Sequence, residues 1–245
     1  MNQKPTVLVA DRDETFLAQV GTLLDRMDFK VLPVKSGSEL LDAVNVMLPD
    51  ILLVDVDLPE PGGLSSLRAL KEAGQLSRVP VVLVSEKADM GIYKQCQDYG
   101  PCSFLMKPLL VEELHSALQL VQVRDTGGRK RLRAPFKGKV VVRSDGQAFE
   151  CTGVTLSEGG VCVQLNSPLA EGTAVEVVLS LPTGGPLTLS GRVSYVQQEQ
   201  GKGSDPPSMA IVFDTVSSED STRMREFVIL LLVGDMLDEQ GACAP

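Results

Sequence analysis

Residues 1–123 alternate short apolar runs with segments of helical apolar spacing, five times over, and this alternation constrains the fold more than any other feature. The apolar runs of strand length are Thr6–Ala10, Lys30–Val34, Ile51–Val54, Val81–Val84 and Ser103–Met106. The segments of helical spacing are Glu14–Met27, Ser38–Val46, Leu64–Glu72, Met90–Gln97 and Val111–Val121. Strands that alternate with helices predict an α/β fold, in which helices cover both faces of a parallel sheet.

Charged side chains follow three of these predicted strands. Asp11, Asp55 and Lys107 each come directly after an apolar run. Ligands of parallel α/β sheets bind beyond the carboxyl ends of the strands. We therefore expect these three residues to converge in one pocket.

The pattern changes at Asp125–Gly128, which reads as a linker. The segments that follow have strand character: Lys139–Arg143, Phe149–Leu156, Val161–Leu165, Ala174–Leu181, Leu187–Gln197 and Met209–Asp214. Many short antiparallel strands predict a barrel or a sandwich. A last helix is expected over Thr222–Leu232. We expect two domains, 1–123 and 129–236, with a linker at 124–128 and a tail at 237–245.

The charge is unevenly distributed. The chain carries a net charge of −9. Residues 124–143 contain eight basic residues and one acid, so this window carries +7 and the rest of the chain −16. A compact basic patch on an acidic protein predicts a local anion site, whereas the acidic remainder would repel the phosphate backbone of DNA.

Other classes of protein are disfavoured. The five cysteines form no CxxC pair, and their odd number in a chain that is not small favours reduced thiols in a cytoplasmic protein. His115 is the sole histidine, so neither a zinc site nor a Ser–His hydrolase is expected, and we predict no enzyme. The first residues lack the apolar stretch of a signal peptide, and Phe227–Val233 is too short to span a membrane.

Several separated motifs in the first half resemble a response-regulator receiver domain. Asp55–Gly63 resembles the phosphoacceptor loop, Ser85 and Phe104 stand at the switch positions, and Lys107-Pro108 resembles the family's Lys-Pro pair. The resemblance covers about residues 5–123 and implies a flavodoxin-like doubly wound (βα)5 fold. It also implies phosphorylation of Asp55 by a histidine kinase or phosphotransfer protein, with Lys107 near the phosphoryl group. Mg²⁺ is then expected near three acids, Asp11, Asp13 and Asp55.

Arg12 departs from that pattern, because receivers usually place two adjacent acids after the first strand. Arg12 stands at the second of these positions, and Asp13 comes one residue later. Two readings follow. Either Arg12 places a positive charge where Mg²⁺ would bind, or Arg12 points to solvent and Asp13 substitutes.

The second half resembles a PilZ domain over about residues 129–234. Arg129 and Arg133 match the RxxxR signature, and Ser157 and Gly160 match the [D/N]xSxxG signature. Gly191–Tyr195 resembles the GxVxW segment, and Met209–Phe213 resembles the strand before a closing helix. The resemblance implies an antiparallel β-barrel with a C-terminal helix. Cyclic di-GMP would bind through Arg129, Arg133, Ser157 and Gly160.

Two further expectations concern this ligand site. We expect Arg129 and Arg133 to lie in a flexible segment that folds over the ligand. Thr155 stands where the family has Asp or Asn, and it is too short to copy their contact with guanine. The loss of one such hydrogen bond costs about 1–2 kcal/mol, or about tenfold in affinity.

Together these patterns predict a non-enzymatic bacterial signalling protein that couples receiver phosphorylation to cyclic di-GMP binding. Its output would pass through contacts with an unknown downstream protein, with motility or surface behaviour as the setting, and a homodimer is possible. The alternative is a degenerate receiver–PilZ scaffold that binds neither phosphate nor cyclic di-GMP.

Overall fold

The structure is a computed structural model that describes residues 4–77, 79–87, 90–99, 102–121, 131–182, 185–198 and 206–241. The chain divides into two compact units, Met1–Lys130 and Arg131–Pro245. The predicted linker, 124–128, lies outside the described residues.

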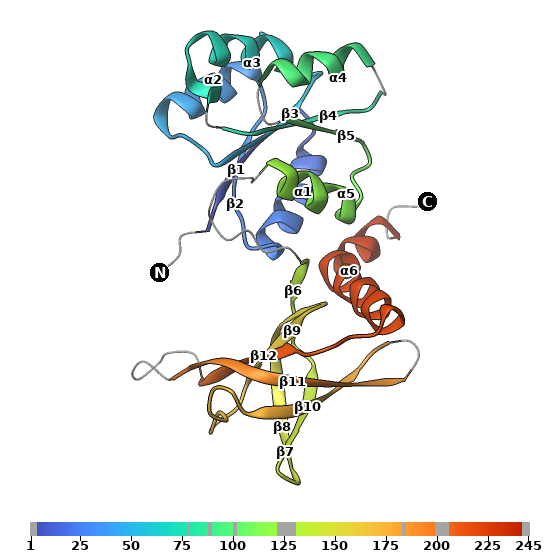
Figure 1. The fold of residues 1–245 in the computed structure, drawn as a ribbon. Coiled ribbons are helices and arrows are strands. Elements are labelled where there is room, and N and C mark those ends of the chain that lie inside the picture. Colours follow the sequence, from blue (N-terminus) through green and yellow to red (C-terminus); the bar gives the residue numbers. More distant parts are fainter. Residues whose placement is uncertain are drawn as a thin grey trace. The chain divides into compact units, whose positions relative to one another are not determined.

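The first unit is a five-stranded parallel sheet in the order β2-β1-β3-β4-β5. Its strands are β1 (Thr6–Ala10), β2 (Lys30–Val34), β3 (Ile51–Asp55), β4 (Val81–Ser85) and β5 (Cys102–Met106). Its α-helices are α1 (Glu14–Arg26), α2 (Gly37–Val46), α3 (Gly63–Glu72), α4 (Met90–Cys96) and α5 (Val111–Val121). Two short 3₁₀ helices are η1 (Gln75–Ser77) and η2 (Gln97–Tyr99). Helices α2, α3 and α4 cover one face of the sheet, and α1 and α5 cover the other (Figure 1). The predicted α/β fold is confirmed.

The central strands are buried along their whole length, which explains their continuous apolar sequences. Every residue of β3 and of β4 is buried. Strands covered on both faces lose the alternation of apolar and polar residues that half-buried strands show. Each of these two strands ends one residue later than predicted, so that Asp55 and Ser85 are their last residues.

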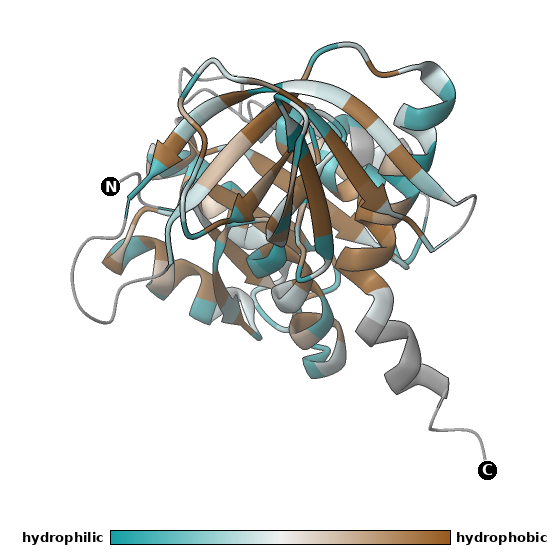
Figure 2. Ribbon diagram, turned by 90° about the horizontal axis from the view of Figure 1, so that it is seen from below, coloured by the Kyte–Doolittle hydropathy of each residue, from teal (hydrophilic) through white to brown (hydrophobic). Residues whose placement is uncertain are grey.

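The second unit is a closed antiparallel barrel. Its strands are β7 (Lys139–Ser144), β8 (Gln147–Ser157), β9 (Gly160–Gln164), β10 (Ala174–Ser180), β11 (Pro186–Gln197) and β12 (Ser208–Phe213). The order is β8-β7-β10-β11-β12-β9, and β9 pairs with β8 to close the ring. Apolar and polar residues alternate along these strands, so that one face of each fills the interior (Figure 2). The predicted barrel is confirmed.

An additional short strand, β6 (Arg133–Pro135), pairs with β8 outside the ring. The sequence did not predict it. The expectation that Arg133 lies in a flexible segment is therefore wrong, because its backbone is held in a ladder opposite Ser157.

The C-terminal helix α6 spans Ser218–Gly241, so it runs past the predicted end at Leu232 into the predicted tail. Ser217 caps its first turn, where its Oγ accepts a hydrogen bond from Asp220 N at 3.0 Å. The helix packs against β6 and β8, and the rings of Phe227 and Phe136 meet edge to face with centroids 5.8 Å apart.

The expectations for the cysteines and for a membrane-spanning segment can now be compared with the structure. Cys151 and Cys162 are free thiols, but Cys102 is disulfide-bonded, so the expectation of reduced cysteines is wrong for that residue. Among the described residues, no helix has the length and the apolar character that are needed to cross a bilayer.

Candidate functional site

The three charged residues predicted to converge do so at the carboxyl ends of β1, β3 and β5. Lys107 Nζ lies 2.6 Å from Asp11 Oδ2 and 2.7 Å from Asp55 Oδ2. Both carboxylates are buried, whereas the lysine side chain keeps 13% of its surface exposed. One ammonium group is thus shared by two buried carboxylates at the edge of a parallel sheet.

The backbone orients both carboxylates in the same way. Asp11 Oδ1 accepts a hydrogen bond from Asp13 N at 2.9 Å, and Asp55 Oδ1 accepts one from Asp57 N at 2.8 Å. Each of these turns fixes one carboxylate oxygen to the chain two residues on. The other oxygen, Oδ2, is thereby directed to Lys107.

Two acids that share one base leave an excess negative charge. Burial raises the pKa of Asp11, its contact with Lys107 offsets this in part, and the neighbouring Asp55 carboxylate raises it further. Burial alone would lower the pKa of Lys107, but its contacts with the Asp11 and Asp55 carboxylates outweigh burial, and the pKa is raised. The lysine is therefore held charged, and a further cation would stabilise the ionised form of Asp11. The ammonium also lies 4.3 Å from the centroid of the Phe16 ring.

The pocket fits Mg²⁺ through Asp11 and Asp55. Asp11 Oδ2 is buried and, among the described residues, has no well-aligned hydrogen-bond donor, although Lys107 Nζ is close to it. Mg²⁺ is commonly held by one or two carboxylates and completes its shell with water and phosphate oxygens. These two carboxylates meet that requirement.

The third predicted metal residue, Asp13, has another structural role. It is exposed and caps α1, with its Oδ1 accepting hydrogen bonds from Thr15 N at 2.8 Å and Phe16 N at 3.4 Å. No group of three or more His, Cys, Asp or Glu side chains suited to a metal occurs in the described part of the chain. Arg12 is exposed, which agrees with the reading that it points to solvent.

The predicted switch residues lie on the two strands that follow β3 in the sheet. Ser85 ends β4, next to β3, and is buried, with its Oγ accepting a hydrogen bond from Lys87 N at 3.1 Å. Phe104 lies on β5, half-buried against the core of the sheet. At the start of α3, Gly63 approaches the Asp55 carbonyl so closely that a Cβ atom would collide with it, which explains why glycine occupies this position.

The second predicted site lies where β6, β8 and β9 meet. Arg133 is opposite Ser157, and Ser157 is opposite Gly160 across the β8–β9 hairpin. Ser157 Oγ donates a hydrogen bond to Gly160 O at 3.2 Å. A Cβ atom on Gly160 would collide with Ile211 O on β12. Three of the four predicted ligand residues are thus brought together, while Arg129 lies outside the described residues.

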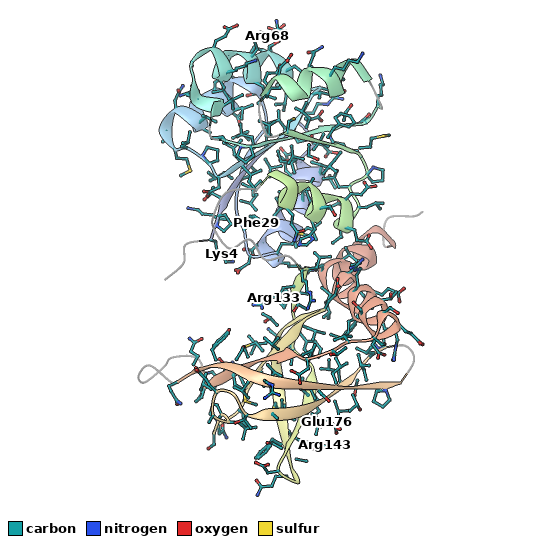
Figure 3. The ribbon with its side chains drawn as sticks, in the orientation of Figure 1. Lys4, Phe29, Arg68, Arg133, Arg143 and Glu176 are labelled. Carbon is teal, nitrogen blue, oxygen red and sulfur yellow. The ribbon has the colours of Figure 1, made fainter. Side chains whose placement is uncertain are left out.

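The basic window does not act as one cluster. Arg143 lies at the other end of the barrel from Arg133, where it pairs with Glu176 on the neighbouring strand (Figure 3). The Nη1 atom of Arg143 is 2.8 Å from Glu176 Oε1. The side chain of Arg131, in contrast, covers Gly159, where an added Cβ atom would meet its guanidinium group. Arg143 is therefore separate from the predicted ligand residues, whereas Arg131 lies beside one of their neighbours.

The sequence analysis missed Cys162, which lies near Arg133, and its hydrogen-bond partner Ser208. Burial raises the pKa of the Cys162 thiol, against hydrogen bonds with Ser208 and Tyr195 and the nearby charge of Arg133. Cys162 lies opposite Thr155. The alternation of buried and half-buried residues along β9 and β12 points Cys162 and Ser208 outward, and this alternation is the sequence signal from which both could have been predicted.

A surface hollow of about 570 Å³ lies at the amino ends of β1 and β2, lined by Lys4, Thr6, Asp25, Lys30 and Val31. Lys4 already pairs with Asp25, 3.2 Å away. This end of a parallel sheet is opposite to the one where ligands bind, and we assign it no site.

Comparison with known families identifies both halves of the chain. Residues 7–119 match the response regulator receiver domain, and residues 128–230 match the PilZ domain. The chain is a receiver domain followed by a PilZ domain. Receiver domains belong to two-component signal transduction, PilZ domains bind cyclic di-GMP, and both are typically non-catalytic regulatory domains.

Individual relatives of this receiver–PilZ chain match its first half. Two-component response regulator-like APRR1 of Arabidopsis thaliana is 36% identical over 110 residues, which are 44% of this chain and 18% of that protein. The polar-differentiation response regulator DivK of Brucella ovis is 27% identical over 106 residues, 43% of this chain and 86% of that protein. The structure of the chemotaxis protein CheY4 of Vibrio cholerae is 22% identical, covers 48% of this chain and 98% of its own, and has a TM-score of 0.45.

Proposed function

We propose that this receiver–PilZ protein accepts a phosphoryl group on Asp55, binds cyclic di-GMP on its barrel, and passes the combined signal to another protein. The observation that carries the proposal is the arrangement in which Lys107 is shared by Asp11 and Asp55, at 2.6 and 2.7 Å. Burying charged groups costs free energy, because they lose their contacts with water. A buried cluster of this kind at the ligand-binding edge of the sheet supports phosphoryl chemistry.

The chemistry follows from the positions of the oxygens. In phosphoryl transfer, Asp55 Oδ2 forms a bond to phosphorus while the bond between phosphorus and the donor's leaving atom breaks; that atom is an imidazole nitrogen in a phosphohistidine donor and an oxygen in acetyl phosphate. Lys107 supplies a positive charge beside the transferred group, and Mg²⁺, when bound by Asp11 and Asp55, offsets more of its negative charge. The Ser85 hydroxyl is placed on the neighbouring strand to bond the new phosphoryl oxygens, and Phe104 lies on the strand beyond it. Movement of Ser85 toward the phosphoryl group would let phosphorylation change the conformation of the receiver surface.

The barrel supports recognition of a phosphodiester. Arg133 offers a guanidinium group that can bind a phosphate with two hydrogen bonds or stack on a base. Ser157 lies opposite Arg133, and Gly160 lies opposite Ser157, so both are close to this guanidinium-bearing strand. Arg129, four residues earlier, is assigned to the same clamp on its motif alone.

We assign the input to a histidine kinase or phosphotransfer protein and the output to protein–protein contacts in motility or surface behaviour, in the cytoplasm. In this proposal the protein is not an enzyme. A homodimer is compatible with it.

A degenerate scaffold is the second candidate, and two observations favour it. Arg12 replaces an acid of the receiver pocket, and Thr155 replaces the Asp or Asn of the PilZ motif. Since Arg12 is exposed and the acidic pocket is assembled without it, we prefer the two-input proposal.

Two measurements test the proposal. Intact-mass analysis after treatment with acetyl phosphate and Mg²⁺ should show one added phosphoryl group on the wild type and none on Asp55→Ala. Calorimetry should show heat of binding for cyclic di-GMP, and Arg133→Ala should weaken the binding strongly, because charged bidentate contacts are among the strongest hydrogen bonds. An unmodified wild type with no heat of binding at about 100 μM ligand, well above a micromolar Kd, would establish the scaffold instead.

A further inference from the structure

We propose that Arg225 on α6 is a positioning residue of the cyclic di-GMP site, acting through Glu158; this inference rests on the proposed ligand. Glu158 lies between two predicted ligand residues, Ser157 and Gly160, in the turn that joins β8 to β9. Arg225 lies 67 positions away in the sequence, on the helix that follows the barrel.

The contact between Glu158 and Arg225 is bidentate. Arg225 Nε donates to Glu158 Oε1 at 2.8 Å, and Nη2 donates to Oε2 at 3.2 Å. The glutamate side chain is only 10% exposed, while that of the arginine is 56% exposed. Two parallel hydrogen bonds between planar groups fix the position of the turn as well as its charge.

The charge of Glu158 is the reason that the pair matters for an anionic ligand. A buried carboxylate beside the backbone that approaches a phosphodiester would repel it, and little solvent is available to screen that repulsion. The Arg225 guanidinium group neutralises the carboxylate from the helix side. Ser157 and the Gly160 backbone can then contact an anion without an uncompensated negative charge on Glu158 between them.

Helix α6 also contacts the other half of the ligand site. Its Phe227 packs edge to face on Phe136, and the helix lies along β6, the strand that carries Arg133. The Phe136 ring in turn fills the space above Gly138 and Gly153, where an added Cβ atom would collide with it. One helix thus contacts both the arginine strand and the serine–glycine turn.

The test compares the affinity of the full chain for cyclic di-GMP in four proteins: wild type, Arg225→Ala, Glu158→Gln and the double variant. Arg225→Ala should weaken binding about tenfold, because it leaves an unpaired carboxylate beside the ligand. Glu158→Gln should bind as tightly as the wild type or up to about threefold more tightly, because it removes a negative charge near the anion. The affinity of the double variant should recover to within about threefold of that of the wild type, since neither an unpaired carboxylate nor an unpaired guanidinium group remains.

Arg223→Ala is the matched control, because it removes the same charge from the same helix. Its guanidinium group contacts Gly185 O at 3.0 Å and Asp220 Oδ1 at 3.5 Å, and neither residue belongs to the ligand site. It should leave the affinity within about twofold of the wild type. A thermal melt of each variant reports whether the barrel remains folded. If Arg225→Ala unfolds, Arg225→Lys replaces it, because lysine keeps the charge but cannot make two parallel hydrogen bonds. Arg225→Lys should bind cyclic di-GMP more weakly than the wild type, by less than the tenfold expected for Arg225→Ala.

The outcomes separate the two proposals. If the wild type does not bind cyclic di-GMP, the proposed function fails, and this inference fails with it. If the wild type binds but Arg225→Ala binds equally well, the inference alone is wrong. If Glu158→Gln weakens binding as much as Arg225→Ala, the pair only supports the fold and the charge argument is overturned.

Discussion

Lys107→Met should strongly destabilise the receiver domain. The substitution keeps most of the aliphatic chain but removes the only ammonium group that contacts Asp11 and Asp55 among the described residues. Removing one partner of a buried ion pair typically costs about 3–5 kcal/mol, because a buried charge is left uncompensated. For a domain of this size each kcal/mol corresponds to roughly 4 °C, so the melting temperature should fall by about 10–20 °C.

The assay is differential scanning calorimetry of the full chain, with Mg²⁺ absent and then present. The pKa of Asp11 is already raised by burial, and without the lysine it rises further. The folded state then binds the proton more tightly than the unfolded state, so stability is greatest below the unfolded pKa and is lost as the pH rises through the folded pKa. The penalty of Lys107→Met should therefore shrink as the pH is lowered towards 4, near the ordinary pKa of Asp.

Two controls sharpen this prediction. Asp11→Asn in the Lys107→Met background should restore most of the lost stability, because it removes one of the two carboxylates. Mg²⁺ should stabilise Lys107→Met more than the wild type, because the metal then supplies the missing positive charge. A melting temperature within about 2 °C of the wild type at pH 7, with no response to Mg²⁺ or pH, would refute the reasoning, since it implies less than about 1 kcal/mol from the lysine.

Three further predictions can be checked separately. Asp13→Ala should cost about 1 kcal/mol in urea unfolding through loss of the α1 cap, and it should leave acetyl phosphate labelling of Asp55 largely intact if Asp13 is a cap rather than a metal ligand. Cys151, whose pKa burial raises to about 11, should resist alkylation in the folded protein at pH 8, where roughly one thiol in a thousand is ionised; rapid labelling at pH 8 would contradict its burial. Thr155→Asn should tighten cyclic di-GMP binding by about tenfold in calorimetry, since it restores one hydrogen bond, and an unchanged affinity would show that residue 155 does not face the ligand.

The sequence predicted the receiver fold well because its signals are local. Apolar runs of strand length separated by amphipathic segments have few other solutions, and polar residues at the carboxyl ends of parallel strands must meet. Asp11, Asp55 and Lys107 were placed together on this ground, and the distances confirm it. Asp13 shows the limit of the method. A carboxylate just before a helix can bind a metal or cap the helix, and only the structure shows its hydrogen bonds to Thr15 and Phe16.

The second site was harder to predict, because its contacts are distant in the sequence. The strand β6 has three residues and too little periodicity to be recognised, so Arg133 was assigned to a flexible segment. The partner of Glu158 could not be found from the sequence at all, since Arg225 lies on a helix whose orientation is set by packing on β6 and β8. The motif indicated the residues that we propose as ligand residues, but the tertiary structure was needed to find the residues that contact them.

The central claim is that one chain links the phosphorylation state of its receiver to cyclic di-GMP binding by its PilZ domain. The most direct measurement is the calorimetric affinity for cyclic di-GMP with and without beryllofluoride and Mg²⁺, which mimic the phosphorylated aspartate. We predict binding in both states and about a fivefold difference between them, the lower end of typical allosteric coupling, with a reciprocal effect of the ligand on beryllofluoride binding. Equal affinities, with beryllofluoride shown to be bound, would contradict the account and leave two independent domains on one chain.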